Sequence, residues 1–150
     1  MIENKDKTQF RAYREMVGMT QQDFAKEMGV TVESVKKWEN PKYSQVPPND
    51  AWDILENAVD RQIKMIDFAI KKFESLKDEF EEKPGVMLPY WRTQEEFEKA
   101  HPNENGSFTM ANANTRLVAF ELTRRGYHIN FGWGGLKETL DKSPIADCRN

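Results

Sequence analysis

The sequence contains one cysteine and two histidines, and it has no long run of apolar residues. Cys148 has no partner for a disulfide within the chain, which is typical of a reducing compartment. Since these three residues lie far apart, they form no metal-ligand pattern, and we expect neither a metal nor another cofactor. No apolar stretch approaches the ~20 residues that cross a bilayer, and the first ten residues lack the apolar core of a signal peptide. These absences predict a cytoplasmic protein without a membrane partner.

A strong charge of either sign is also missing, because 22 basic residues oppose 25 acidic ones for a net charge of −3. The charge is unevenly spread, with a net charge of +1 over residues 1–45, −4 over residues 46–83 and balance over residues 84–150. The N-terminal part is therefore the least repellent to phosphate. Neither histidine lies beside a serine or cysteine nucleophile in a recognisable frame, which predicts that the protein is not an enzyme.

Two short helices are predicted near the N-terminus. The first covers residues 8–17 and ends at Gly18. The second begins after Thr20, which forms a capping box with Asp23, and ends at Gly29. Glycine at that position favours a tight turn with left-handed backbone, which brings a third helix close to the second.

The third helix begins after Thr31 and ends before Asn40 and Pro41. Val35 and Trp38 lie on one face of it, and we expect both to be buried. The opposite face carries a mixture of acidic, basic and apolar side chains. A pair of short helices with this turn and this mixed face is typical of a helix-turn-helix, whose second helix enters the major groove of DNA.

The segment TQQDFAKEMGVTVESVKKWEN carries a resemblance to a known family. Residues 8–55 resemble the helix-turn-helix domain of the Cro/lambda-repressor (XRE) family. The glutamine after the first cap, the alanine in mid-helix, the glycine of the turn and the closing Glu-Asn all fit. The family usually has a glycine after this motif, where this chain has Pro41, so the loop that leaves the third helix is expected to differ.

The resemblance implies a set of DNA contacts. The side chains expected over base edges are Val32, Glu33 and Lys37, which meet a thymine methyl, cytosine N4 and guanine O6/N7. Those expected at phosphates, where contacts set register, are Gln21, Thr31, Lys36, Asn40 and Lys42. Gln21 is also placed to reach a base. Ser34 completes the exposed face.

These assignments have simpler alternatives. Glu33 is also compatible with an exposed acid that the dipole at a helix N-terminus favours. Lys36 and Lys37 are also compatible with solvated surface charge, and the three helices with a plain bundle. Trp38 is expected in the core and not in a base-stacking platform.

Residues 50–82 form the longest periodic run and predict one amphipathic helix. Apolar residues recur every seven positions, which favours pairing with another helix. The recurring positions are Trp52, Val59, Ile66, Phe73 and Phe80, with Leu55, Ala69 and Leu76 at the complementary position and Gln62 as a polar exception. Ile63 and Ile70 widen the stripe, so packing within one chain is equally allowed.

The remainder predicts a small α/β part that serves dimerisation. Strands are expected at residues 86–91 and 127–131, with helices at 93–100 and 110–125, followed by a polar tail. In the second strand Tyr127, Ile129 and Phe131 alternate with polar residues and are expected on the half-buried face. An isolated two-stranded sheet is marginal in water, so pairing with a second copy is expected. A two-fold dimer would also place two recognition helices roughly 34 Å apart, one turn of DNA.

The C-terminal string from LPYW to GYHINF is similar to small two-part regulators, including anti-CRISPR-associated autorepressors of phages and mobile elements. That similarity implies a homodimer that represses its own operon from an inverted repeat of double-stranded DNA. An antitoxin-like or adaptor protein, whose C-terminal part binds a protein partner, is the alternative. RNA binding is disfavoured because no exposed aromatic stacking motif is evident.

Taken together, the patterns predict a mainly α protein with a small β component. Its three parts are a helix-turn-helix domain over residues 1–48, a long helix over residues 49–83 and an α+β dimerisation part with a polar tail over residues 84–150.

Overall fold

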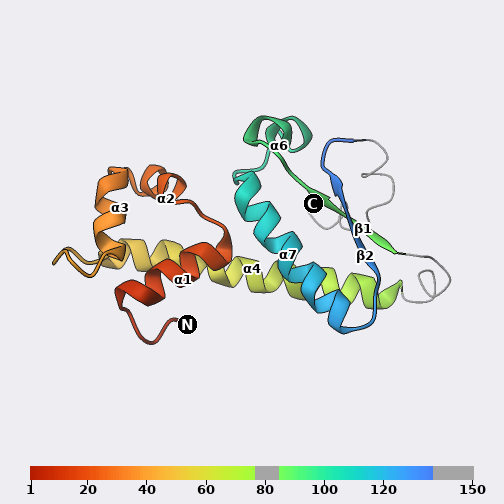
Figure 1. Cartoon of the computed structure of the whole chain (residues 1–150), viewed down its shortest axis with the longest axis horizontal. Helices are drawn as coiled ribbons and strands as arrows, with labels where there is room; N and C mark the ends of the chain where they lie inside the picture. The colour runs from red at the N-terminus through yellow and green to blue at the C-terminus, as the bar shows by residue number, and fades with distance from the viewer. Residues whose placement is uncertain (77–84, 137–150) are drawn as a thin grey trace. The chain divides into compact units, whose positions relative to one another are not determined.

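A computed structural model describes residues 1–76 and 85–136 of the chain. It is mostly helical with one two-stranded sheet (Figure 1), which confirms the predicted fold class. The chain divides into two compact units, Met1–Gln62 and Ile63–Asn150. The long helix α4, Asn49–Ser75, crosses the boundary, so each unit contains one part of it.

The first unit contains three short helices whose ends follow the predicted signals. They are α1 (Lys7–Val17), α2 (Gln21–Met28) and α3 (Val32–Glu39). The Thr20 hydroxyl accepts a hydrogen bond from the backbone N–H of Asp23 at 3.0 Å, which confirms the capping box. Thr31 caps α3 in the same way. Gly18 ends α1 with a left-handed φ of 81°.

Aromatic rings from all four helices form the centre of this unit. The Phe10 ring packs edge-on against those of Phe24, Trp38 and Trp52, with ring centroids 5.1, 6.1 and 5.4 Å away. Trp38 is buried, as predicted. Edge-to-face geometry is favourable because the positive ring edge meets the negative ring face. The start of α4 therefore belongs to the core of the helix-turn-helix unit.

The second unit is built around a parallel pair of strands. Its elements are β1 (Val86–Tyr90), α6 (Gln94–Ala100), α7 (Phe108–Arg124) and β2 (Ile129–Trp133). β1 and β2 pair in parallel, with Leu88 opposite Phe131. A parallel pair needs a crossover connection, and here α6 and α7 provide it. The sequence predicted both strands but not their parallel pairing.

The apolar core of the second unit joins α4, α7 and β1. Its buried members are Ala69, Ile70, Phe73, Val86, Leu88, Val118, Ala119 and Leu122. Beyond β1, the buried Asn112 side chain bonds both backbone groups of Trp91 at 2.8 Å, donating to its carbonyl and accepting from its N–H. This amide ties α7 to the end of β1.

Two predicted elements have different bounds in the structure. The helix predicted over residues 50–82 ends at Ser75, and residues 77–82 lie outside the described part. The strand expected at 127–131 is shifted to Ile129–Trp133, and Phe131, expected on the half-buried face, is 53% exposed. The predicted tail falls mostly within residues 137–150, which are not described.

The heptad positions of α4 are occupied within the chain. Trp52 and Leu55 are buried in the first unit, whereas Ala69 and Phe73 are buried in the second. The polar exception, Gln62, donates from its side chain to the Met16 carbonyl at 2.8 Å. These residues follow the alternative of packing within one chain, so they give no support to a paired seam.

Candidate nucleic-acid interface

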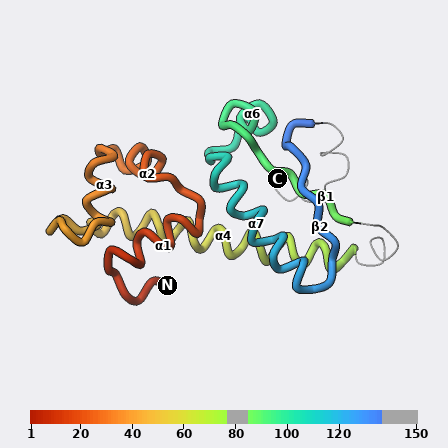
Figure 2. The backbone as a smooth tube through the Cα atoms, viewed as in Figure 1, coloured from red at the N-terminus to blue at the C-terminus, as the bar shows by residue number. Residues whose placement is uncertain are grey.

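The helix pair α2–α3 is joined by the tight turn that the sequence predicts (Figure 2). Gly29 has a left-handed φ of 67°, and its N–H donates to the Lys26 carbonyl at 3.2 Å. The N–H of Val30 donates to the Ala25 carbonyl at 3.0 Å. A Cβ at Gly29 would have nothing within 4 Å. Glycine is therefore favoured here by its backbone freedom and not by a lack of space.

The face of α3 opposite the core carries the predicted base-reading residues. Glu33 and Lys36 are exposed and form an ion pair with each other at 3.1 Å. An exposed pair of this kind contributes about 0–1 kcal/mol, so DNA can separate it at little cost. Val32 and Ser34 are half-buried, and the Ser34 hydroxyl lies 3.0 Å from that of Thr31. The first turn of this face is therefore tied to the residue that caps the helix.

The loop after α3 differs from a glycine-ended helix, as Pro41 led us to expect. Asn40 is extended, with φ −101° and ψ 119°, which is the conformation a following proline favours. The Asn40 side-chain oxygen accepts from the N–H of Lys42 at 3.0 Å. The Lys37 ammonium lies 5.5 Å from the ring centroid of Tyr43, within range of a cation–π interaction. These interactions hold the side chains of Lys37 and Asn40, which are two of the predicted DNA contacts.

Lys7, on α1, holds the C-terminal end of α3. Its ammonium donates to the backbone carbonyls of Lys37, Asn40 and Tyr43, each at 2.7 Å. A lysine has three N–H donors, and all three are used. Cations near a helix C-terminus are stabilised by the unpaired carbonyls there. Lys7 therefore connects the recognition helix, its exit loop and α1 through one side chain.

Replacing Lys7 with methionine should weaken DNA binding about tenfold, because three carbonyls at the end of α3 and in its exit loop lose hydrogen bonds to a charged donor. The dependence of binding on salt should not change, since all three N–H donors of this ammonium are used by those carbonyls. Affinity measured across a salt series tests this.

Lys5→Met is the matched control, since Lys5 makes only a 3.9 Å ion pair with Glu56. We expect it to bind nearly as the unmodified chain does. If the salt slope of Lys7→Met is smaller than that of the unmodified chain, Lys7 contacts phosphate. That result would contradict its role in holding the end of α3.

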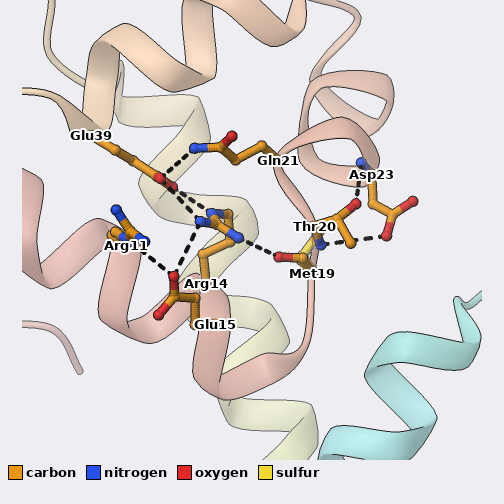
Figure 3. A network of polar contacts seen from close by, with 8 residues as sticks. All are labelled: Arg11, Arg14, Glu15, Met19, Thr20, Gln21, Asp23 and Glu39. Atoms are coloured by element: carbon orange, nitrogen blue, oxygen red, sulfur yellow. Dashed lines mark hydrogen bonds and ion pairs between the residues drawn. The ribbon is translucent and has the colours of Figure 1, made fainter.

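A buried ion pair connects α1 to the end of α3 (Figure 3). Arg14 contacts Glu39 through two nitrogens, one of them at 3.0 Å, and the two side chains are 7% and 3% exposed. Arg14 also donates to the Met19 carbonyl at 2.7 Å. A bidentate pair of this kind fixes direction as well as distance. The pair therefore sets where α3 ends relative to α1 and to the start of α2.

Gln21 belongs to the same network. Its side-chain amide donates to Glu39 at 2.7 Å, and the residue is half-buried at the first position of α2. The structure thus brings Gln21 to the end of α3. Its contact with phosphate stays a prediction, and the bond to Glu39 would fix the direction from which the remaining amide atoms approach DNA.

Positive charge at this surface is modest and partly compensated. Lys36 is paired with Glu33, while Lys42 is exposed on the loop. On α1, the hydrogen bond from Arg11 to Glu15 raises the pKa of Arg11. A single copy therefore presents a weak field to phosphate.

The sequence patterns gave no prediction of a role at this surface for Lys7, Arg14, Glu39 or Tyr43. A signal existed for Arg14, because it lies four residues after the core residue Phe10 and so on the buried face of α1. A charged residue on a buried face requires a partner. The partner could not be named from the sequence, because it lies 25 residues away.

Other kinds of site receive no support from the described residues. Within residues 1–76 and 85–136 no three metal-ligating side chains come together. In the same ranges, no helix is both long and apolar enough to span a membrane.

Comparison with known proteins agrees with this geometry. Residues 10–56 match the model of a helix-turn-helix family. The match extends from α1 to the first turns of α4 and supports a DNA-binding regulator of the XRE kind. No curated protein matches the chain. The similarity of the C-terminal part to anti-CRISPR-associated autorepressors therefore receives no support.

Proposed function

We propose that this chain is a sequence-specific transcriptional repressor that binds an inverted repeat of double-stranded DNA as a homodimer. The observation that carries the proposal is the capped α2–α3 pair, whose second helix is held at its end by Lys7 and by the Arg14–Glu39 pair. A rigidly held helix with a mixed exposed face can read base edges in the major groove.

The proposed contacts are those that the resemblance to XRE-type helix-turn-helix domains implies. The residues proposed at base edges are Val32, Glu33 and Lys37, with Ser34 beside them. Those proposed at phosphates are Gln21, Thr31, Lys36, Asn40 and Lys42. The modest charge of one copy favours a two-fold dimer, because two half-sites add their binding free energies.

Selection of bound sequences from random duplex DNA tests the proposal. We expect enrichment of a palindrome with half-site centres about 10 base pairs apart, bound with a steep salt dependence. Failure to enrich any sequence at low salt would contradict the proposed function. If only a single half-site is enriched, sequence-specific DNA recognition is supported but the proposed inverted repeat is wrong.

Lys37→Ala should cost about 1–3 kcal/mol of binding to the selected site and relax the preference at one base pair of each half-site. The reason is that a lysine donating to guanine O6/N7 discriminates among base pairs. Binding to variants of the selected site, with each base pair changed in turn, measures this.

Lys42→Gln is the matched control on the adjoining loop. As a phosphate contact it should weaken binding to all sequences alike and reduce the salt slope by about 1. If Lys37→Ala weakens binding to every sequence equally, Lys37 contacts phosphate, as Lys42 is proposed to do, and not a base.

A further inference from the structure

The segment around β2 is apolar and uncharged, yet it lies at the surface. Residues 126–136 include no lysine, arginine, aspartate or glutamate. Phe131, Trp133 and Leu136 are 53%, 50% and 56% exposed. Edge strands of soluble proteins usually carry charges that prevent pairing with another strand. Since no such charge is present here, nothing in these side chains opposes pairing with another strand.

Among residues 1–76 and 85–136, one side of the β2 backbone faces no other strand. In the described part of the chain the sheet contains only β1 and β2. On the β1 side, the His128 carbonyl accepts from Val86 at 2.6 Å and the Gly134 N–H donates to Tyr90 at 2.8 Å. Since backbone groups alternate along a strand, the N–H and C=O groups of Ile129, Phe131 and Trp133 point to the other side.

The exposed rings along this edge are held in place by neighbours. The Phe131 ring packs edge-on against Tyr90, with centroids 5.9 Å apart. The guanidinium of Arg92 lies 5.8 Å from the Trp133 ring centroid. Ordered rings lose little further freedom when a partner covers them, which favours association.

We propose that β2 pairs with β2 of a second copy in antiparallel orientation, forming a four-stranded sheet across a two-fold axis. The inference rests on the proposed dimeric function and assigns its interface. A two-fold interface brings a surface against itself, so an uncharged surface avoids like-charge repulsion. Two strands related by a two-fold axis perpendicular to the sheet are antiparallel, and four strands are more stable than two.

Other occupants fit this edge less well. A nucleic acid requires basic side chains, but residues 126–136 supply none, and the nearby Arg92 is paired with Glu96. A second apolar surface, between α4 and α7, has a volume of about 600 Å³ and includes Phe120, which is 68% exposed. Its rim is charged, with Asp67, Lys71, Glu74, Glu121 and Arg125. This groove therefore provides the control.

Sedimentation velocity of the full chain from 1 to 100 µM tests the pairing. An interface of two short strands is small, on the order of 1,200 Å² or less, so a concentration-dependent dimer is expected. Phe131→Lys should be monomeric throughout, whereas Phe120→Lys should dimerise like the unmodified chain. The unmodified chain remaining monomeric, or Phe120→Lys alone being monomeric, would overturn the proposal.

A mixture of Phe131→Lys and Phe131→Glu distinguishes a lost interface from a lost fold. Opposite charges at the two-fold contact should restore a heterodimer that neither variant forms alone. If the mixture stays monomeric, the contact at Phe131 is wrong.

DNA binding separates this proposal from the proposed function. Phe131→Lys should bind an isolated half-site as the unmodified chain does but bind the palindrome about tenfold more weakly. Equal binding of the palindrome by both chains would refute the interface and leave sequence recognition intact. If the unmodified chain does not bind the half-site, the proposed function is refuted instead.

Discussion

Replacing Arg14 with methionine is expected to lower the free energy of unfolding by about 3–5 kcal/mol. The substitution leaves the Glu39 carboxylate, which is 3% exposed, without its bidentate partner in a site closed to water. It also removes the donor to the Met19 carbonyl. Urea unfolding followed by circular dichroism measures the change, and the midpoint should shift without a change in slope.

The double substitution Arg14→Met with Glu39→Leu is the informative control. An apolar pair of similar volume needs no counter-charge, so most of the lost stability should return. A double variant as unstable as Arg14→Met would show that the loss comes from packing or from the Met19 bond. The double variant should bind DNA more weakly than the unmodified chain, because the bond from Gln21 to Glu39 is also lost.

Replacing Phe10 with alanine should cost about 3–5 kcal/mol of folding free energy. Phe10 is fully buried, and its ring touches three other aromatic rings, one from each of α2, α3 and α4. Removal of the ring leaves a cavity that four helices cannot close without moving together. Chemical denaturation followed by tryptophan fluorescence measures the change, because Trp38 and Trp52 lie against this ring.

Phe120→Ala is the matched control, since that phenylalanine is 68% exposed on α7. Its loss should change the free energy of unfolding by about 0.5 kcal/mol or less. Equal effects at Phe10 and Phe120 would contradict the assignment of Phe10 to the centre of the first unit.

The DNA-binding half could be predicted because its signals are local. Thr20 with Asp23, Thr31 and Gly29 each act within a few residues of a helix end, so their roles follow from spacing. Val35 was expected to be buried from helical periodicity and is fully buried. The exposed face of α3 follows from the same periodicity.

The supporting contacts of that half could not be predicted. Lys7 reaches carbonyls 30 to 36 residues away, and Arg14 reaches Glu39 across 25 residues. No spacing rule relates residues so far apart, because their approach depends on how the helices pack. Gln21 likewise meets its partner Glu39, 18 residues away, only in the folded chain.

The C-terminal half shows the same division more strongly. The sequence predicted two strands, the second of them from alternating residues at 127–131, but strand 86–91 could have paired with its partner in either direction. The parallel register, with Val86 opposite Ile129, depends on the crossover through α6 and α7. It leaves Phe131 exposed at an edge, although alternation had placed that ring on the half-buried face.

The sequence by itself determined the ends of α2 and α3, the turn at Gly29 and the residues on each face of the recognition helix, because backbone caps and periodicity act over a few residues. The tertiary structure decided which long side chains hold that helix, how α4 is shared between two cores, and how the two described strands pair. These features depend on contacts between distant segments, and only the packing of the whole chain brings them together.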